Sequence, residues 1–538
     1  MKGRLFSRYA VWIMCILAFC TAFILRSTSV WGLTFLVISG SLTLLGAWNL
    51  SQSRHSILRN YPVIGHVRWL IETIRPEIRQ YLLEGENEQT PFSRAQRSLV
   101  YKRSKAISAD QPFGTMFDVY ADGYEFIQHS VRPADPVDST TFRTTIGNDQ
   151  CKQPYSASVF NISAMSFGSL SANAIRALNK GAAKGGFYHD TGEGGVSLHH
   201  REFGGDLVWE IASGYFGCRT NDGRFDSDEF AKQASDPQIK MIEIKLSQGA
   251  KPGHGGILPG KKVTAEIAEA RGVAIGEDCI SPARHSAFNT PLEMMAFVGQ
   301  LRTLSGGKPV GFKLCIGQPW EFMAIVKAML ESGIVPDFVV VDGGEGGTGA
   351  APVEFTNRIG MPMREGLLFV HNVLIGAGLR GRIKIGAAGK IISAFDLATV
   401  LAIGADWTNS ARGYMFALGC IQSMNCHTNR CPTGVATQDQ SRQRALVVPD
   451  KAERVRQFHD QTVRALADML AAAGLSHPDD LQPHHVAHRI SRTEVRQFDQ
   501  MHVFLEPGEL LNGECSHQYF HKNWQMAHAT SFNPQSVG

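Results

Sequence analysis

The sequence predicts an α/β protein whose main domain is a (β/α)8 TIM barrel, preceded by a two-helix transmembrane hairpin. Three observations lead to this fold class. Two uncharged apolar runs open the chain, short β-branched runs alternate with helical patterns from 155 to 440, and glycine-rich loops follow several of those runs. The expected domains are the hairpin over 1–50, a connector or cap over 51–150, the barrel over 151–445 and a C-terminal extension over 446–538.

The composition is that of an ordinary globular chain. Of its 538 residues 19% are charged, and the net charge of +4 comes without any run of Lys and Arg. A nucleic-acid partner is therefore not expected. The ten cysteines are too dispersed for a disulfide framework. Seven of them stand singly and are expected to be small buried side chains.

The two apolar runs, residues 9–25 and 30–48, are each about long enough to cross a bilayer as a helix. Only RSTS (26–29) joins them, so we expect a hairpin. A cleaved signal peptide is the rival interpretation, but a second apolar run follows at once and no A-x-A site is evident.

Basic residues indicate how this hairpin is oriented. Only Arg26 lies between the runs, whereas three basic residues precede them and three follow: Lys2, Arg4, Arg8, Arg54, Arg59 and Arg68. The positive-inside rule then places both termini and the catalytic domain on the cytoplasmic side of the inner (cytoplasmic) membrane. Beyond the hairpin, residues 65–84 have the pattern of an amphipathic helix interrupted at Pro76.

Eight candidate strands follow. They are SVFNIS (158–163), GGFYH (185–189), LVWEIA (207–212), KMIEIKL (240–246), VGFKLCI (310–316), FVVVD (338–342), RIKIGA (382–387) and DWTNSA (406–411). Helical patterns lie between several of them, at 173–184, 292–304, 320–332 and 394–404. This alternation favours a closed barrel over the alternative, a doubly wound open sheet, because no G-x-G-x-x-G fingerprint follows the first strand.

The glycine-rich loops follow the strands at the end where barrels keep their chemistry. They include AMSFGSLS (164–171), DTGEGGVS (190–197), SQGAKPGHGGILPGKKV (247–263) and DGGEGGTGAAP (342–352). Loops AAGK (387–390) and SARG (410–413) follow strands seven and eight, where barrels commonly hold a phosphate. Gly389, Lys390, Ala411 and Arg412 are therefore candidates for binding one.

Three cysteines, Cys420, Cys426 and Cys431, lie within twelve residues at the spacing C-x5-C-x4-C. A structural zinc site usually takes four protein ligands, and a cubane iron–sulfur cluster usually takes four thiolates. Three thiolates without an obvious fourth are compatible with a cluster that lacks one iron. Buried free thiols or a partial zinc site are the alternatives.

Together these residues resemble the FMN-binding synthase domain of glutamate synthases. Six motifs occur in the family's order over about 150–445: AMSFGS, TGEGG, QGAKPGHGGILPGKKV, ISP (280–282), DGGEGGTGAAP and GCIQSMNCHTNRCPTGVATQ. The resemblance implies a TIM barrel with FMN and a 3Fe-4S cluster on the three cysteines. In this family ammonia condenses with 2-oxoglutarate and reduced FMN delivers a hydride to 2-iminoglutarate. L-glutamate results, and the electrons arrive through the cluster.

Matched motif by motif, the resemblance implies that Lys245, Lys251 and Arg271 are the cations around 2-oxoglutarate. A dicarboxylate needs such partners. Lys251 is the candidate proton donor near the imine, and Glu193 is a catalytic candidate on the loop that faces the arriving ammonia. The ordinary alternatives are a solvated surface lysine for Lys251, a helix-end arginine for Arg271 and a turn carboxylate for Glu193.

The resemblance also implies a set of flavin contacts. Ala164, Met165 and Ser166 would run along the flavin ring, with Met165 also facing the substrate. Lys313 stands among apolar residues and needs an anionic partner, which the N1–C2=O edge of the reduced flavin would supply. Tandem glycines would approach the ligands closely: Gly343 and Gly344 at FMN, and Gly346 and Gly347 at the substrate.

The sequence departs from the family in several places. No N-terminal amidotransferase domain is expected, so ammonia would come free, from a separate amidotransferase, or as another amine. No NAD(P)H fingerprint is evident, so the expected electron donor is another protein or a membrane carrier. Within the substrate loop His254 replaces an acid, and Ile257 replaces a glutamine that hydrogen-bonds 2-oxoglutarate. Losing that bond costs on the order of 1 kcal/mol.

Three hypotheses follow. The first is a membrane-anchored, glutamate synthase-like oxidoreductase acting on CH–NH2 donors, which reduces an imine of 2-oxoglutarate. The second is an FMN and iron–sulfur oxidoreductase acting on a different keto acid or amine, as Ile257 indicates. The third is a non-catalytic, membrane-tethered redox scaffold, against which Lys251, Arg271 and the three cysteines argue.

Overall fold

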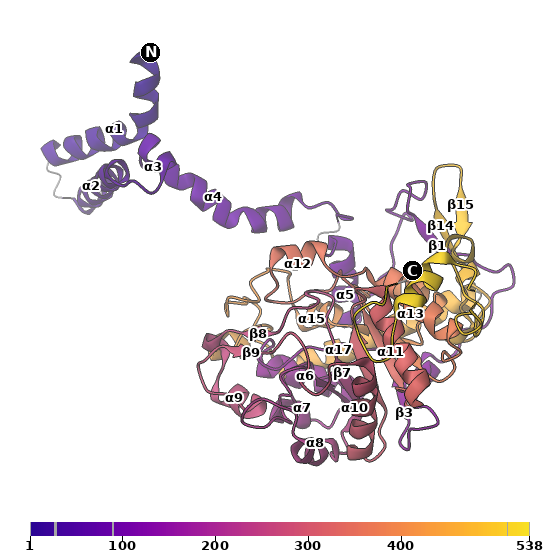
Figure 1. Cartoon of the computed structure of the whole chain (residues 1–538). Helices are drawn as coiled ribbons and strands as arrows, with labels where there is room; N and C mark the ends of the chain where they lie inside the picture. Colours follow the sequence, from indigo (N-terminus) through magenta and orange to yellow (C-terminus); the bar gives the residue numbers. More distant parts are fainter. Residues whose placement is uncertain (1, 26–28, 89–90, 514, 537–538) are drawn as a thin grey trace. The chain divides into compact units, whose positions relative to one another are not determined.

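The structure is a computed structural model that describes residues 2–25, 29–88, 91–513 and 515–536. The chain divides into two compact units, Met1–Arg94 and Ala95–Gly538 (Figure 1), and the division falls inside the segment 51–150. Each unit is described by itself below.

The first unit opens with two apolar helices, α1 (Lys2–Leu25) and α2 (Val30–Ser51). They pack closely through the small residues Gly46 and Gly40 of α2. A Cβ at Gly46 would lie 2.0 Å from Trp12, and a Cβ at Gly40 would lie 3.0 Å from Phe19. Trp12 Nε1 also donates to the carbonyl oxygen of Thr43, at 3.0 Å. Segments 8–25 and 30–51 are long and apolar enough to cross a membrane by length and composition. Residues 26–28 of the predicted link lie outside the described residues.

The expected amphipathic helix over 65–84 is present, but Pro76 does not interrupt it. After α3 (Ser56–Asn60), helix α4 (Gly65–Ile78) passes through Pro76 and continues as a π-helical turn, η1 (Arg79–Leu83). Proline removes one backbone donor and crowds the carbonyl four residues before it, and the change to a wider turn begins three residues after Pro76. The Arg79 N–H bonds to the carbonyls of both Arg75 and Pro76, which carries the chain into the wider turn.

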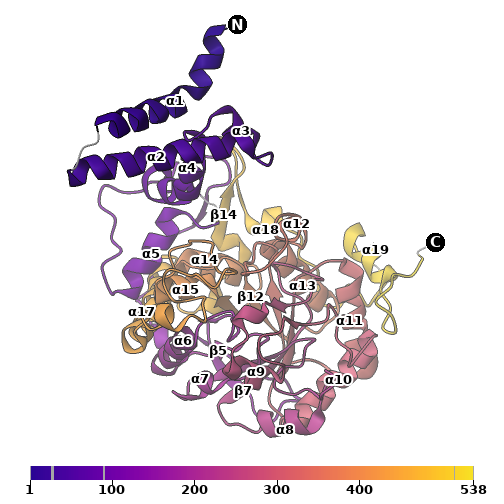
Figure 2. The ribbon, with the colours of Figure 1, turned by 90° about the vertical axis from the view of Figure 1, so that its left-hand side faces the viewer.

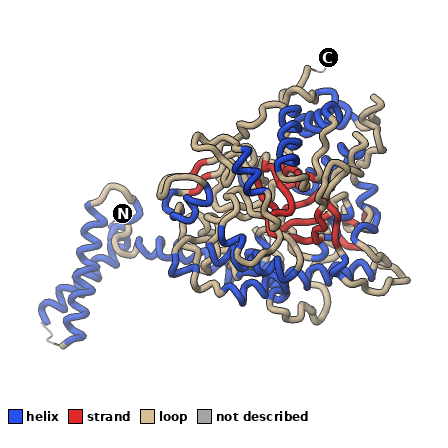
Figure 3. Tube along the Cα trace, turned by 90° about the horizontal axis from the view of Figure 1, so that it is seen from below, coloured by secondary structure: helices blue, strands red, loops and turns tan. Residues whose placement is uncertain are grey.

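The second unit contains the predicted barrel (Figure 3). Eight parallel strands close in the order β10-β11-β12-β13-β4-β5-β6-β7, so the (β/α)8 prediction is confirmed. The strands are β4 (Phe160–Ile162), β5 (His189–Asp190), β6 (Leu207–Ile211), β7 (Ile239–Lys245), β10 (Val310–Leu314), β11 (Phe338–Asp342), β12 (Lys384–Ala388) and β13 (Trp407–Ser410). Every predicted strand overlaps one of these.

Helices surround the barrel. Those that match predicted patterns are α6 (Ala172–Gly185), α10 (Pro291–Leu304), α11 (Pro319–Ser332) and α14 (Ala394–Ala402). The others in this layer are α8 (Ser227–Ala234), α13 (Met363–Gly376), α15 (Arg412–Leu418) and α17 (Val448–Ala472). Helix α17 belongs to the predicted C-terminal extension. It packs tightly on α6, since a Cβ at Gly181 would lie 2.5 Å from Val455.

Smaller elements complete the unit. The helices are α5 (Arg94–Ser104), α7 (Leu198–Arg201), α9 (Ala265–Arg271), α12 (Val353–Arg358), α16 (Gln440–Gln443), α18 (Phe498–Met501) and α19 (Gln518–Met526). Strands β1 (Glu125–Ile127), β14 (Val486–Arg489) and β15 (Val495–Gln497) form a three-stranded antiparallel sheet, and β8 (Ile257–Leu258) pairs with β9 (Cys279–Ile280). The 3-10 turns are η2 (Ser139–Thr141), η3 (Gly260–Lys262), η4 (Pro478–Asp480) and η5 (Pro483–His485).

Large side chains fill the interior of the barrel. A hairpin of β2 (Arg143–Ile146) and β3 (Tyr155–Ser158) contributes Ile146, Tyr155 and Ala157 to a buried cluster with residues from the starts of several strands. Tyr188 and Trp407 belong to this cluster, and Trp407 Nε1 donates to the Tyr188 hydroxyl at 2.8 Å. The barrel is therefore a packed core whose free end is the one that carries the loops.

Candidate active site

The glycine-rich loops meet at the C-terminal ends of the strands, as the barrel prediction requires. A Cβ at Gly249 would lie 1.7 Å from the carbonyl oxygen of Gly343, and one at Gly192 would lie 2.7 Å from the Ser166 nitrogen. Asp342 Oδ2 accepts from the Gly249 N–H at 2.7 Å. The glycines in these motifs are thus required by backbone-to-backbone contact between loops that are distant in sequence.

The cations predicted for the substrate gather around Glu193. Lys245 Nζ lies 2.9 Å from Glu193 Oε2 and 2.7 Å from Gln248 Oε1. Burial alone would raise the pKa of Glu193, but Lys245, then Arg271 and Lys251, lower it to about 2. Three cations and one carboxylate leave this group of side chains with a net charge of about +2.

Arg271 is buried with few partners. Its Nη2 donates to the carbonyl oxygen of Phe167 at 3.1 Å, and its guanidinium lies 5.0 Å from the centre of the Phe216 ring. Its Nε has no hydrogen-bond partner among the described residues, and within the described chain no carboxylate forms an ion pair with it. Burying a guanidinium without a paired anion is costly, so the site is built to receive one.

Lys251 is also buried rather than a solvated surface lysine. It is 4% exposed, and its Nζ donates to the carbonyl oxygen of Gly255 at 3.0 Å. Burial lowers the pKa of Lys251, and neighbouring Lys245 adds to this effect against the attraction of Glu193. A lysine whose pKa is lowered gives up its proton more readily, as a proton donor requires.

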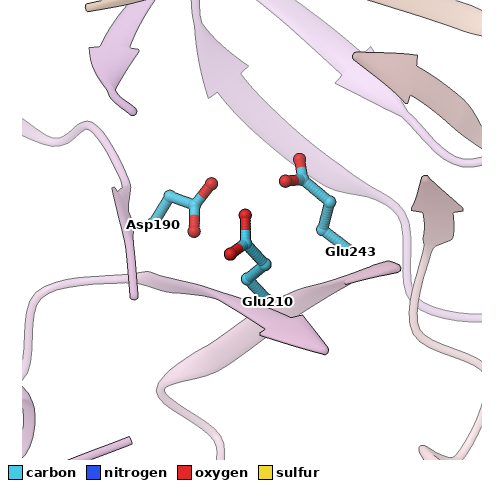
Figure 4. Close-up of side chains that lie close together, drawn as sticks. All are labelled: Asp190, Glu210 and Glu243. Atoms are coloured by element: carbon cyan, nitrogen blue, oxygen red, sulfur yellow. The ribbon is translucent and has the colours of Figure 1, made fainter. Parts of the chain in front are cut away.

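Lys313 lies inside the barrel, where the protein itself supplies its anionic partners. Its Nζ is in contact with Glu210 Oε2 and lies 3.1 Å from Glu243 Oε2. Asp190 completes a cluster of three carboxylates, from β5, β6 and β7, whose oxygens converge in Figure 4. None of these acids was predicted from the sequence. Glu210 carried a signal, because it is the single charge in the otherwise apolar strand LVWEI, the pattern that singled out Lys313.

The surroundings of Glu243 and Asp190 favour the protonated forms of these acids. Burial and the charge of Glu210 raise the pKa of Glu243 to about 7 against the opposing effect of Lys313, and burial together with Glu243 raises the pKa of Asp190 well above its usual value. Three buried acids with one lysine between them cannot all be ionised. The cluster is also connected to the cations around Glu193, since Lys245 Nζ lies 3.9 Å from Glu210 Oε1.

The predicted phosphate site contains two cations. Lys390, in the left-handed region at φ +51°, and Arg412 follow β12 and β13. Burial lowers the pKa of Arg412 to about 10, and burial together with Arg412 lowers the pKa of Lys390. Arg412 Nη2 donates to the carbonyl oxygen of Glu345 at 2.7 Å, and a Cβ at Gly347 would lie 2.8 Å from Arg412. Two mutually repelling cations beside glycine backbone fit a phosphate group.

The remaining predicted flavin contacts lie on the same end of the barrel. Ala164, Met165 and Ser166 directly follow β4, and Met165 and Ser166 are buried. Gly344 and Gly389 also contact other parts of the chain closely. A Cβ at Gly344 would lie 2.8 Å from the Gly360 carbonyl oxygen, and a Cβ at Gly389 would lie 2.8 Å from Met363. A Cβ at Gly346 would lie 3.1 Å from the Ala250 nitrogen, and Ala411 immediately precedes α15. These glycines are therefore held against other parts of the chain, and Lys390 and Arg412 are the residues at this end that would hold the phosphate of FMN.

The three-cysteine loop has the donors that an iron–sulfur cluster needs. The Gln422 N–H points to Cys420 Sγ at 3.5 Å, and Thr433 Oγ1 lies 3.4 Å from Cys431 Sγ. Backbone groups of 433, 435 and 436 also surround Cys431, whose pKa they lower against the effect of burial. N–H and O–H groups aimed at sulfur are typical of cluster environments, so the loop fits the group.

Two residues from other parts of the chain hydrogen-bond to the backbone of the three-cysteine loop. Tyr101, on α5, donates its hydroxyl to the carbonyl oxygen of Cys420 at 2.6 Å. The buried Lys262 donates to the carbonyl oxygen of Cys426 at 3.0 Å. The motif LPGKKV thereby connects the substrate loop to the cysteine loop.

The two departures from the family lie on the substrate loop. His254 Nδ1 lies 2.8 Å from the carbonyl oxygen of Gly255, so this nitrogen carries the ring proton. Ile257 is 43% exposed on β8. An isoleucine side chain there offers no hydrogen bond.

Comparison with known proteins agrees with this geometry. The region described as "Conserved region in glutamate synthase" matches residues 125–476. "Glutamate synthase large subunit-like protein YerD" of Bacillus subtilis is 38% identical over 495 residues, or 84% of this chain and 94% of that one. The archaeal glutamate synthase (NADPH) of Methanocaldococcus jannaschii is 34% identical over 60% of each chain, so this chain spans about three fifths of that relative.

Solved structures add little to this. A flavocytochrome b2 variant with pyruvate bound is 12% identical, with a TM-score of 0.41, over 83% of this chain and 90% of that one. A likeness of that size carries no argument beyond the barrel seen directly.

The fold and site define an α/β-barrel oxidoreductase with cations gathered above its strands. The chain belongs to the glutamate synthase family, since the conserved region of that family covers more than half of it. Its curated relatives bear the names of enzymes.

Proposed function

We propose that this protein reductively aminates 2-oxoglutarate to L-glutamate through 2-iminoglutarate, with FMN on the barrel loops and a 3Fe-4S cluster on Cys420, Cys426 and Cys431. The observation that carries the proposal is the group formed by Lys245, Lys251 and Arg271 around Glu193, whose net charge of about +2 matches a dicarboxylate. Family membership supports the reaction class.

In this mechanism Arg271 and Lys245 hold the two carboxylates of the substrate. Arg271 is buried and the side chain of Lys245 is only 11% exposed, so their attraction for anions is little screened. Ammonia condenses with the keto carbon, and one water leaves. Lys251 then donates a proton to the substrate nitrogen, and Glu193 orients the incoming ammonia. FMN held by the barrel loops would supply the two electrons and the hydrogen for the carbon, and a cluster held by Cys420, Cys426 and Cys431 would supply single electrons.

The carboxylate cluster inside the barrel balances the positive charge of the cations around Glu193. Glu210 and Glu243 both lie against Lys313 inside the barrel, and this lysine would stabilise the edge of a bound flavin that becomes negative on reduction. Asp190 and Glu243 hold a proton near the site. The overall change consumes two electrons and two protons per keto acid, so a nearby proton store serves the reaction.

We further propose that α1 and α2 anchor the enzyme in the cytoplasmic membrane with the barrel in the cytoplasm. Their length and apolar composition, and the basic residues outside the pair, support this. The electron donor is then an electron-donor protein or a membrane carrier that reaches the cysteine loop. Ammonia arrives free or from a separate amidotransferase.

The test is an anaerobic stopped-flow experiment on full-length, detergent-purified, photoreduced protein. The flavin band is followed after mixing with 2-oxoglutarate and ammonium. Rapid reoxidation with formation of glutamate is the expected result. Arg271→Lys is the matched variant, which should retain flavin and slow this step at low keto-acid concentration.

A second candidate function has its own observation. Ile257 and His254 change the substrate loop, so the same chemistry on a different keto acid or amine is the alternative. Flavin that is present but stays reduced with 2-oxoglutarate and ammonium would overturn the first proposal. Reoxidation by another keto acid would then establish the second.

A further inference from the structure

Helix α4 and the turn η1 carry an apolar face that the described residues of the first unit leave exposed. Val67, Leu70, Ile71, Ile74 and Tyr81 are all exposed, Leu70 at 61%. Their spacing places them on one side of a helix. A soluble monomer seldom leaves such a stripe in water, so the face has a partner.

One edge of this face is cationic. Arg68, Arg75 and Arg79 recur at intervals of seven and four residues, which places them together on a single flank of the stripe. Arg75 lies 3.7 Å from Glu72 and Arg79 contacts Glu88, but these pairs are exposed. Exposed pairs are weak and exchange readily, so the arginines remain able to bind phosphates.

A buried side chain fixes where α4 starts relative to α2. Asn49, near the end of α2, is fully buried, and its Oδ1 accepts from the Val63 N–H at 3.0 Å and lies 3.2 Å from His66 Nε2. Val63 has a φ of +65°, which turns the chain sharply at this point. Figures 1 and 2 together show that α4 runs across the direction of α2.

A helix that crosses the direction of a membrane-spanning helix lies along the membrane surface. We propose that α4 is an interfacial helix, with its apolar face among the upper acyl chains and Arg68, Arg75 and Arg79 on the phosphates of anionic lipid. This inference rests on the proposed membrane attachment of α1 and α2. It commits to lipid because the stripe is continuous in sequence with two apolar helices and is lined by cations on one side.

The experiment uses the full-length protein in nanodiscs of phosphatidylethanolamine with one quarter phosphatidylglycerol. The photocrosslinker p-benzoylphenylalanine replaces Ile74 on the apolar face, or Thr73 on the other side as the matched control. A third site, Phe35 on α2, reports on the anchor itself and is exposed. Irradiated samples are digested, and lipid adducts are quantified by mass spectrometry.

The proposal expects lipid adducts at Ile74 that exceed those at Thr73 severalfold. It also expects the Arg68→Gln, Arg75→Gln and Arg79→Gln triple variant to reduce the adducts at Ile74 to the level seen in discs of phosphatidylcholine. Crosslinks from Ile74 to barrel peptides would overturn it, because α4 would then pack on protein.

Absence of lipid adducts at Ile74, with adducts present at Phe35, would also overturn the inference while leaving the membrane anchor standing. Absence of lipid adducts at both Ile74 and Phe35 would reject the membrane anchor as well as the interfacial helix. Neither result bears on the proposed reaction, which is read from the flavin and from glutamate.

Discussion

Lys245, at the end of β7, and Glu193, on the loop after β5, form an ion pair with Nζ 2.9 Å from Oε2, although they lie 52 residues apart in the chain. The same lysine lies 3.9 Å from Glu210. Lys245 thereby connects the group of cations around Glu193 with the carboxylate cluster inside the barrel. In the proposed reaction a substrate carboxylate would share Lys245 with Glu193, so the interaction of each acid with this lysine would depend on the other.

Arg271 is expected to set the affinity for the keto acid. Arg271→Lys loses the bidentate hydrogen bonding of a guanidinium to a carboxylate and should raise KM for the keto acid about tenfold or more. Arg219→Lys is the control, because Arg219 lies over the same Phe216 ring, at 5.5 Å against 5.0 Å for Arg271. Steady-state kinetics decide the matter, and an equal effect of the two variants would show that only packing on the ring matters.

Ile257→Gln should restore the hydrogen bond of the family at this position. One such bond contributes on the order of 1 kcal/mol, so KM for 2-oxoglutarate is expected to fall about fivefold. Ile257→Val controls for side-chain volume without adding a polar group. If the glutamine variant leaves KM unchanged, 2-oxoglutarate does not lie against β8.

Lys313→Met should destabilise the barrel strongly, because it leaves Glu210 and Glu243 buried without their cation. Breaking a buried pair in this way costs about 3–5 kcal/mol. The double variant Lys313→Met with Glu210→Gln removes one of the two acids and should recover part of the loss. Thermal unfolding in detergent measures both, and a single variant as stable as the parent protein would contradict the assigned network.

Glu243 should make stability depend on pH. Burial and Glu210 raise its pKa from 4.5 to about 7 in the folded protein. The folded state therefore holds a proton that the unfolded state has released, so this stability is complete below about pH 4.5 and is lost as pH rises through about 7. The effect is on the order of 3 kcal/mol.

Glu243→Gln removes this dependence. The unfolding temperature of the parent protein should fall between pH 5 and pH 8 by more than that of the variant, as measured by differential scanning fluorimetry. Parallel curves for the two proteins would mean that Glu243 is ionised throughout that range.

Each of Cys420→Ser, Cys426→Ser and Cys431→Ser should remove the cluster. The full chain is expected to bind about three iron atoms with the electron paramagnetic resonance signal of an oxidised 3Fe-4S centre. Cys515→Ser, a change outside the triplet, serves as the control and should keep both. Retention of full iron in a triplet variant would reject the assignment, and zinc in place of iron would favour the zinc alternative.

Most of the barrel could be predicted because its strands are apolar, short and bounded by glycine. Segment 338–342 matches β11 to the residue, whereas 185–189 overlaps β5 only at His189. β5 has two residues in the barrel, and its neighbours Phe187 and Tyr188 pack as core side chains instead. Hydrophobic pattern does not separate these two uses of an aromatic residue.

The site was predicted less completely, for a different reason. Motifs identified the cations Lys245, Lys251 and Arg271, but not the acids Glu210 and Glu243. Strand periodicity reveals that a side chain points inward, yet not which strand lies opposite. The pairing of Lys313 with two acids depends on barrel closure, which sets β6, β7 and β10 side by side.

The packed N-terminal end of the barrel also determines by which route small molecules reach the site. Among the described residues, Tyr155, Tyr188 and Trp407 are packed in a buried cluster at the lower end of the barrel. In the proposed reaction, keto acid, ammonia and amino-acid product would therefore all pass through the opening formed by the loops. A glutaminase that hands over ammonia would consequently have to dock at that opening, where it competes for space with the exchange of substrate and product.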